Sequence, residues 1–228
     1  MARKLIIFIA RIGLRIISRR QIVGIENVPD DSPIIVTSNH IGFLDVIMIP
    51  SVPMLSSHPN LIVVIAEKYE KKPFLKWVIN ILGFIFIDRY NPDVRAVREV
   101  IKRLKQNGFM LIAPEGTRSS NGSLIEGKTG AAYLAAKTNA TILPISLLGC
   151  EDSTLRTRLL KLKRLDINVQ VGKPYKIPEL PRVNREEFLQ KYTDEIMCRI
   201  AALLPPSRHG FYSEYPRIKE LLISENNE

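Results

Sequence analysis

The sequence has few cysteines and no long uncharged apolar run, and each shortage excludes a class of protein. Its 228 residues include two cysteines, Cys150 and Cys198, and no Cys-x-x-Cys pair, so a disulfide framework is excluded and no metal site is indicated. We expect both thiols to be small buried groups in a reducing compartment. No segment offers the roughly 20 uncharged apolar residues that a membrane-spanning helix requires, so no transmembrane helix is predicted.

Acidic residues are also in short supply relative to basic ones. There are 33 Lys and Arg residues against 23 Asp and Glu residues, which gives a net charge of +10 and an isoelectric point near 9.7. This balance indicates an anionic partner: nucleic acid, an acidic membrane surface or a phosphorylated substrate. Aromatic residues make up only 7% of the chain and fall in apolar runs rather than among the basic residues, which argues against nucleic acid.

The order of apolar segments predicts an α/β domain with a largely parallel sheet flanked by helices. Apolar runs predict strands at 33–37, 61–66, 109–113, 141–147 and 166–171, and in the second half of the stretch 73–87. Helical spacing of apolar residues predicts helices from Pro92 to Gly108, over 129–137 and after Asn184, where Glu187 completes a sequence of the capping-box type.

Residues 3–20 predict a further helix, with a basic stripe beside a wide apolar face. The stripe consists of Lys4, Arg11, Arg15 and Arg19. Such a helix suits a membrane interface, and the alternative is a helix packed on its own domain. We therefore expect an N-terminal amphipathic membrane anchor in residues 1–25, followed by one α/β domain in residues 26–228.

A histidine and an aspartate lie just after the first predicted strand. On a regular helix, positions five apart differ by about 140°, so His40 and Asp45 can pair only at a strand-to-helix junction. Such a pair has the parts of a base dyad, in which Asp45 orients the imidazole and His40 takes a proton from an attacking hydroxyl. The alternative is a structural histidine that caps a helix.

A second polar cluster leaves the end of the predicted strand 109–113. Gly116, Thr117 and Arg118 offer backbone N–H groups, a hydroxyl and a guanidinium fork, which are the parts of a phosphate site. Glu115 would repel a phosphate, so we expect its carboxylate to hold an arginine or a backbone group in place. Taken alone, the segment also fits an ordinary loop.

The segment from Gly122 to Thr129 matches the P-loop pattern G-x₄-G-K-[ST]. That pattern binds a nucleotide only where the loop directly follows a buried strand and opens a helix. Here the polar residues 117–121 precede it, and no second acidic strand for magnesium is evident. Nucleotide hydrolysis is therefore not expected.

Together these residues resemble the glycerolipid acyltransferase family, of the bacterial 1-acyl-glycerol-3-phosphate acyltransferase type. Four blocks match in the family's order: Asn39-His40-x₄-Asp45, Gly83 to Arg89, Pro114 to Ser119, and Leu143-Pro144-Ile145. Two positions depart from the family. Ala113 stands where the family usually has Phe, and the common Phe-Lys-x-Gly is replaced by residues 125–130, in which Lys128 is a candidate for the missing cation. These departures leave the identity of the acceptor open.

The resemblance implies transfer of a fatty acyl group from acyl-CoA or acyl-carrier protein to the free hydroxyl of 1-acyl-glycerol-3-phosphate, which makes phosphatidic acid. His40 is then the general base and Asp45 its orienter. The residues implied to bind substrate are Arg89, Glu115, Gly116, Thr117, Arg118 and Lys128. The amides of Gly116 and Thr117 are also candidate oxyanion donors.

The same resemblance implies no metal and no cofactor, with the acyl thioester as co-substrate. The expected partners are a membrane phospholipid surface, lysophosphatidic acid and the acyl donor. The expected location is the cytoplasmic face of the cell membrane, as a peripheral or monotopic protein. The alternatives are acylation of glycerol 3-phosphate or another lysolipid, hydrolysis of an acyl group, and non-catalytic lipid binding.

Overall fold

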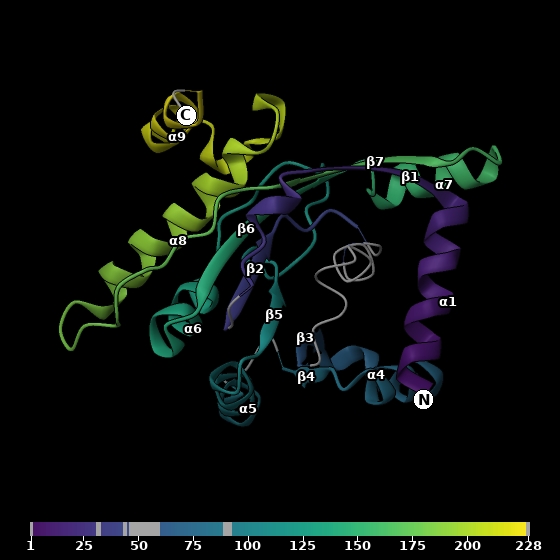
Figure 1. Cartoon of the computed structure of the whole chain (residues 1–228), viewed down its shortest axis with the longest axis horizontal. Coiled ribbons are helices and arrows are strands. Elements are labelled where there is room, and N and C mark those ends of the chain that lie inside the picture. The colour runs from purple at the N-terminus through teal and green to yellow at the C-terminus, as the bar shows by residue number, and fades with distance from the viewer. Residues whose placement is uncertain (1, 31–32, 43–44, 46–59, 89–92, 227–228) are drawn as a thin grey trace.

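Seven strands within the described residues form one sheet (Figure 1). In this computed structural model the described residues are 2–30, 33–42, 45, 60–88 and 93–226. The strands are β1 Ser18–Val23, β2 Ile34–Ser38, β3 Leu61–Ala66, β4 Ile85–Ile87, β5 Phe109–Ile112, β6 Thr141–Leu148 and β7 Leu165–Val171. Their order is β1-β7-β6-β2-β5-β3-β4, and all neighbours are parallel except β6 and β7. The predicted α/β class with a largely parallel sheet is confirmed.

Helices lie on both faces of this sheet (Figure 1). The α-helices are α1 Ala2–Ile17, α4 Pro73–Leu82, α5 Val94–Lys105, α6 Gly130–Thr138, α7 Asp152–Leu160, α8 Arg185–Ala202 and α9 Pro216–Asn226. Short 3₁₀ turns are η1 Ile25–Asn27, η2 Glu67–Tyr69, η3 Pro206–Arg208 and η4 Gly210–Tyr212. In the described part of the chain, no helix combines the length and the apolar character needed to cross a bilayer.

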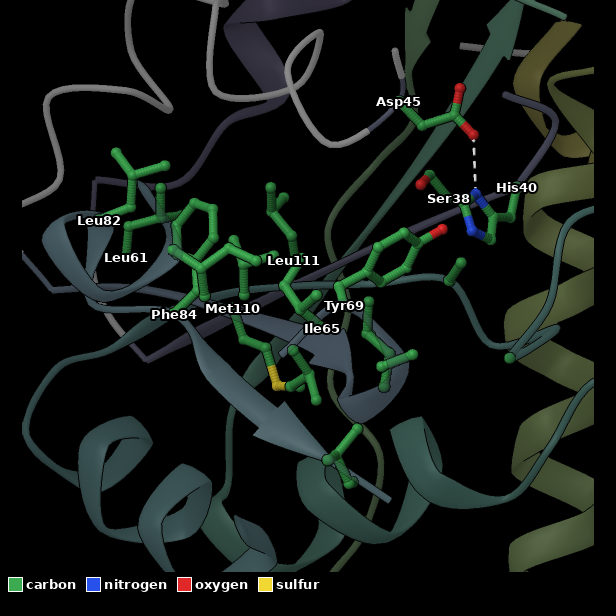
Figure 2. A pocket seen from close by; sticks show the side chains of 18 of the residues that line it. Ser38, His40, Asp45, Leu61, Ile65, Tyr69, Leu82, Phe84, Met110 and Leu111 are labelled. Atoms are coloured by element: carbon green, nitrogen blue, oxygen red, sulfur yellow. Dashed lines mark hydrogen bonds and ion pairs between the residues drawn. The ribbon is translucent and has the colours of Figure 1, made fainter. Parts of the chain in front are cut away.

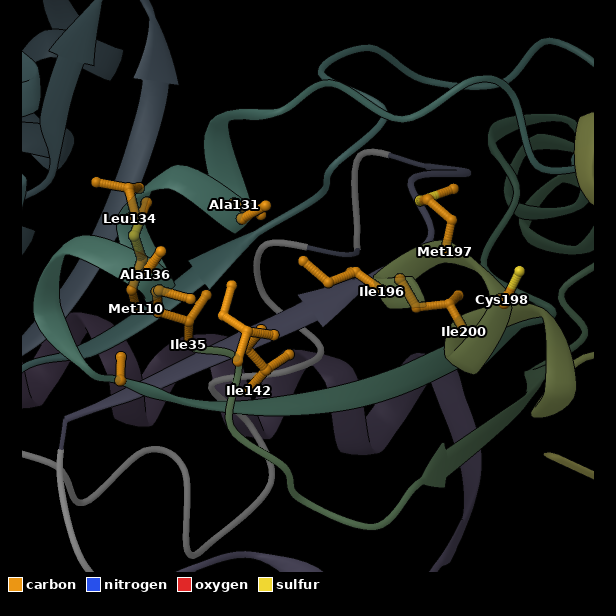
Figure 3. Packing of buried hydrophobic residues seen from close by; sticks show 14 of the residues in the cluster. Ile35, Met110, Ala131, Leu134, Ala136, Ile142, Ile196, Met197, Cys198 and Ile200 are labelled. Atoms are coloured by element: carbon orange, nitrogen blue, oxygen red, sulfur yellow. The ribbon is translucent and has the colours of Figure 1, made fainter. Parts of the chain in front are cut away.

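The central strand β2 supplies side chains to two separate cores, because successive residues of a strand point to opposite faces. Ile35 belongs to the core that β2, β5 and β6 form with α6 and α8, where Figure 3 shows it near Ile142. Ile34 and Val36 belong to the opposite core, which also contains Leu14 of α1. A strand buried on both faces is continuously apolar, which explains why an apolar run rather than an alternation predicted it.

The predicted N-terminal helix is wrong over its last turn. α1 ends at Ile17 rather than at residue 20, and Ser18–Val23 forms the edge strand β1. β1 pairs in parallel with β7, with Ser18 opposite Leu165. The Ser18 hydroxyl donates to the carbonyl oxygen of Leu14 at 2.6 Å and so marks the turn from helix to strand. The pairing partner lies far along the chain, so local periodicity could not reveal it.

The helix ends follow local chemistry in most places. The Asp93 side chain accepts from the Ala96 amide at 3.0 Å at the start of α5, and Gly83 ends α4 in the left-handed conformation. The predicted capping box before α8 is wrong. Asn184 does precede the helix, but it has a φ of 54° and its side chain makes no capping hydrogen bond.

Candidate active site

His40 lies just beyond the carboxyl end of β2, in the middle of the sheet between β5 and β6. Ligand sites of open α/β sheets lie at this edge. Asn39 fixes the chain at this point, because its side-chain amide donates to the carbonyl oxygen of Leu147 at 2.9 Å and accepts from the Leu147 amide at 2.8 Å. The end of β2 is thereby tied to β6, and the backbone at His40 starts from a rigid position.

The predicted contact between His40 and Asp45 is present in the structure. His40 Nδ1 lies 2.9 Å from Asp45 Oδ2, as the dashed line in Figure 2 marks. The same oxygen accepts from the amides of Ile41 at 2.8 Å and Gly42 at 3.0 Å. Three donors therefore converge on one carboxylate oxygen, which fixes the carboxylate and the imidazole relative to the backbone. With Nδ1 engaged, Nε2 remains as the ring nitrogen for proton transfer.

Cys150 supports the other oxygen of Asp45. Its thiol lies 3.2 Å from Asp45 Oδ1, and both side chains are buried. Burial, with the nearby charge of Asp45, raises the pKa of the Cys150 thiol, so the thiol stays protonated and can donate. A Cβ on Gly42 would fall 2.1 Å from the Cys150 carbonyl oxygen, so only glycine fits there. The contact joins residues 105 apart, and no local sequence signal could have found it.

Both cysteines are buried, as expected from the sequence. Burial raises the pKa of the Cys198 thiol to about 12, so this thiol is also neutral at physiological pH. Neither thiol has the character of a nucleophile, because the thiolate is the reactive form.

Glu115 lies under the site and is 1% exposed. Its two oxygens accept from the backbone amides of His40 at 2.7 Å and Ile125 at 3.1 Å. Burial raises the pKa of this carboxyl, and the two amide hydrogen bonds act in the opposite direction. The expectation that Glu115 holds a backbone group is confirmed. Its carboxylate joins the His40 backbone to the loop after β5, and Glu115 is not among the residues that line the cavity.

The turn after β5 brings Gly116, Thr117, Arg118 and Lys128 to the cavity that His40 also lines. Gly116 has a φ of 67°, and a Cβ there would lie 3.0 Å from Lys128 Cδ, so the stem of Lys128 packs over this glycine. The Lys128 amide donates to the Pro114 carbonyl oxygen at 2.8 Å, which holds the two segments together. Lys128 is thus beside the turn, although twelve positions of sequence separate it from Gly116.

Two features of the turn limit its predicted roles. The Gly116 amide donates to the Ala113 carbonyl oxygen at 3.0 Å, so this N–H is already used and is a poor candidate for an oxyanion donor. Arg118 forms an ion pair with Asp152 of α7. Both side chains of that pair are exposed, and exposed pairs are worth about 0–1 kcal/mol, so an arriving phosphate can compete for the guanidinium.

The cavity has a volume of about 650 Å³ and combines a polar end with an apolar wall. Figure 2 shows His40, Asp45 and Ser38 at one end and Leu61, Leu82 and Phe84 at the other. The wall includes Leu75, Ile79, Leu82 and Phe84, all from the apolar stretch 73–87. Sequence reasoning missed other lining residues, namely Arg3 and Arg11 of α1 and Lys68 and Tyr69 of η2. These residues lie far from the motifs along the chain, so no local sequence pattern connected them with the site.

Two further sequence matches have different outcomes. Arg89, expected to bind the acceptor, lies outside the described residues. The P-loop-like segment does not directly follow a strand, because β5 ends at Ile112. Its amides are used within the fold: those of Ile125, Gly127 and Lys128 donate to Glu115, to the Tyr212 hydroxyl at 2.9 Å and to Pro114. They are therefore not turned toward a nucleotide phosphate.

An imidazole–carboxylate pair beside an apolar cavity is suited to activating a hydroxyl for attack next to a bound hydrocarbon chain, and the comparison with known proteins points to a class of enzyme that uses such a reaction. A profile of the acyltransferase family matches residues 19–148, which is more than half of the chain. The protein belongs to the acyltransferase family. The resemblance inferred from the four sequence blocks is thereby confirmed.

The similar proteins carry more specific names. The chain is 32% identical over 134 residues to the chloroplastic 1-acyl-sn-glycerol-3-phosphate acyltransferase LPAT1 of Arabidopsis thaliana, covering 56% of this chain and 35% of that protein. It is 25% identical over 193 residues to the 1-acyl-sn-glycerol-3-phosphate acyltransferase of Borreliella burgdorferi, covering 84% and 74%. The crystal structure of the 1-acyl-sn-glycerophosphate acyltransferase PlsC from Thermotoga maritima is similar with a TM-score of 0.62 and 26% identity, covering 89% and 80%. The chain thus spans about a third of the plant relative's length.

Proposed function

We propose that the protein transfers a fatty acyl group from acyl-CoA or acyl-carrier protein to the free hydroxyl of 1-acyl-glycerol-3-phosphate, and so makes phosphatidic acid for phospholipid synthesis. The observation that carries the proposal is the His40–Asp45 pair at the polar end of an apolar cavity. The names of the similar proteins support the choice of acceptor.

In the proposed mechanism, His40 Nε2 takes the proton of the acceptor hydroxyl while Asp45 holds Nδ1 and balances the charge of the imidazolium. The hydroxyl oxygen attacks the thioester carbonyl carbon and forms a tetrahedral oxyanion. The oxyanion collapses, the C–S bond breaks, and the imidazolium returns its proton to the leaving thiolate. No acyl-enzyme is formed, and the products are the ester and the free thiol.

The acceptor phosphate binds beside the base in this proposal, against Thr117, Arg118 and Lys128. Gly116 allows the chain to turn and lets the Lys128 stem pass closely. Glu115 acts indirectly, because its carboxylate accepts from the His40 amide and so holds the His40 backbone in place. Arg89, which belongs to the family's second sequence block, is proposed to bind the same phosphate.

Lys128→Met tests the phosphate site. Methionine keeps an apolar stem over Gly116 but removes the charge, and a hydrogen bond to a charged group is worth about 1.5–3 kcal/mol. We expect the KM for lysophosphatidic acid to rise about tenfold or more, with kcat changed less, in steady-state assays of thiol release. The matched control is Lys137→Met, an exposed lysine of α6 outside the cavity lining. Equal KM values for the two variants would refute the assignment of Lys128.

The outer face of α1 supports a membrane role for residues 1–25. Its exposed large apolar residues form the outer stripe: Leu5, Phe8, Ile9, Ile12 and Ile16. At about 100° per residue these positions share one face, while Ile6, Ile7 and Ala10 line the cavity on the opposite face. The helix therefore packs on its own domain and still presents an apolar surface. Phe74 and Trp77 of α4, a helix that contacts α1, are also exposed.

We propose that the outer stripe lies in the interface of an acidic phospholipid membrane, at the cytoplasmic face where thioester donors are available. The protein is then peripheral or monotopic. Residues 1–25 act as the membrane-associating segment and residues 26–228 as the acyltransferase domain, with β1 joining the first to the sheet of the second.

Ile9→Glu tests the membrane role. Burying an isoleucine side chain is worth about 1.5–3 kcal/mol, and an added charge opposes insertion, so we expect binding to phosphatidylglycerol vesicles to fall at least about tenfold in sedimentation assays. Val183→Glu, an exposed apolar position before α8, is the control and should bind as the wild type does. Unchanged binding of Ile9→Glu would show that the outer stripe does not contact lipid.

The substrate assignment is tested by offering acyl-CoA together with lysophosphatidic acid, glycerol 3-phosphate or other lysolipids. With lysophosphatidic acid as the acceptor, we expect the amount of thiol released to equal the amount of phosphatidic acid formed. A preference for glycerol 3-phosphate or another lysolipid would show that the proposed acceptor is wrong. Free fatty acid in place of ester would indicate hydrolysis, and binding of lysolipid without turnover would indicate a lipid-binding protein.

A further inference from the structure

The turn that follows α7 has an unusual residue at its centre. The amides of Lys161 and Lys163 donate to the Arg158 carbonyl oxygen at 3.1 and 2.9 Å, and between them Leu162 has a φ of 51°. The bond from Lys163 and the left-handed residue before it are features of a Schellman motif, in which the left-handed position is usually glycine because other side chains are strained there. A leucine at this position is unfavourable for the fold.

The same leucine gains nothing by burial. The Leu162 side chain is 96% exposed and that of Leu160 is 77% exposed. A strained backbone combined with a solvated large apolar side chain does not stabilise the folded chain. An outlier of this kind points to a use outside the fold.

Basic residues surround these two leucines. The exposed cations are Arg156, Lys161, Lys163 and Arg164. The acids that border the turn, Asp152 and Asp166, are both in ion pairs, with Arg118 and with Arg158. The turn therefore presents apolar tips within a positive surface, which complements a surface of negative headgroups above hydrocarbon.

The turn is continuous with the outer stripe. Arg164 donates to the carbonyl oxygens of Arg15 and, at 2.7 Å, of Ile16, and so caps the C-terminal end of α1. The register of β1 with β7 places Ser18 opposite Leu165. In Figure 1 the end of α7 accordingly lies next to the end of α1. Ile16, the last residue of the outer stripe, is thus joined to the base of the turn.

We infer that residues 160–164, the basic turn, are a second contact with an anionic bilayer. Leu160 and Leu162 enter below the headgroups, and Lys161 and Lys163 meet the lipid phosphates. The inference rests on the proposed membrane association of α1 and adds a separate element to it. With contacts at both α1 and the turn, the helix that lines the cavity is held at two places on the membrane.

Leu162→Gly tests this inference, because a structural and a membrane role predict opposite signs. Glycine suits the left-handed position, so we expect the melting temperature to be equal to or above that of the wild type. Loss of one inserted leucine should weaken binding to phosphatidylglycerol vesicles by about tenfold. Turnover of a short-chain, water-soluble acceptor should not change. Val183→Gly, at an exposed position just before α8, should change neither vesicle binding nor this turnover; the start of α8 lies across the molecule from α7 in Figure 1.

The outcomes separate this inference from the proposal on which it rests. If Ile9→Glu weakens vesicle binding and Leu162→Gly does not, the basic turn is not a membrane contact. If Leu162→Gly lowers the melting temperature and binding falls only with unfolding, the leucine is structural and the inference fails. If vesicle binding is unchanged but turnover with an acyl-carrier-protein donor falls, the turn docks the carrier instead. Wild-type protein that does not bind vesicles would overturn the membrane role as a whole.

The charge of the turn is tested by Lys161→Gln with Lys163→Gln, which leaves both leucines in place. Each lysine near an anionic surface contributes about 1 kcal/mol, so the double variant should bind phosphatidylglycerol vesicles at least about tenfold more weakly and lose part of the salt dependence. Equal salt dependence in the wild type and the double variant would exclude a role for these lysines.

Discussion

Replacing His40 by alanine should lower kcat by about 10²–10⁴-fold, because assistance from a positioned general base is typically of that size. The substitution removes only the imidazole. The backbone contacts at this position, from the His40 amide to Glu115 and from the Ser119 amide to the His40 carbonyl oxygen at 2.9 Å, do not depend on the side chain. We therefore expect the melting temperature to stay close to that of the wild type.

The kinetics of this variant distinguish a base from a binding group. A base acts in the transition state, so kcat and kcat/KM should fall together while the KM for lysophosphatidic acid stays similar. His209→Ala serves as the contrast, because His209 is buried and its Nε2 lies 3.0 Å from the Leu204 carbonyl oxygen. That variant should lose stability and keep the kcat of its folded fraction. If His40→Ala turned over at the wild-type rate, the assignment of His40 as the general base would be refuted.

Asp45→Asn should lower kcat by about 10²–10⁴-fold, since taking the partner from the imidazolium that forms during the reaction breaks a partly buried ion pair, which costs about 3–5 kcal/mol. The asparagine oxygen can still accept from the amides of Ile41 and Gly42, so the loop keeps its shape. What disappears is the negative charge behind the imidazolium.

Asp152→Asn is the matched control for Asp45→Asn. Asp152 is an acid near the same site, but it is exposed and its ion-pair partner is Arg118. Its replacement should change kcat less than about threefold, in line with the small energy of exposed pairs. If the two variants had similar kcat values, Asp45 would be no more than a structural acceptor.

The His40–Asp45 contact could be predicted from sequence because both residues belong to one short segment. Five positions across a strand-to-helix junction leave few ways to arrange the chain, and the contact has the expected partners. The same holds for strands such as β3, whose bounds at Leu61 and Ala66 match the apolar run. In each case the information lies in neighbouring residues.

Other parts of the site could not be predicted in this way. Cys150 reaches Asp45 and Lys128 reaches Gly116 only after β6 and the loop after β5 have folded against β2. β1 was assigned to a helix because its strand character depends on β7. Helix α9 and the antiparallel direction of β7 likewise depend on packing that joins distant segments.

The sequence by itself determined the α/β class, the His40–Asp45 contact, a structural rather than phosphate-binding place for Glu115, and the family. These features depend on residue type and on spacing over a few positions, which backbone geometry translates directly into structure. Tertiary structure alone decided that α1 forms a wall of the cavity with Ile6 and Ile7, that Arg118 is paired, and that the base of the basic turn lies beside Ile16. Those outcomes come from contacts between distant segments, whose free energy exists only when the sheet has brought them together.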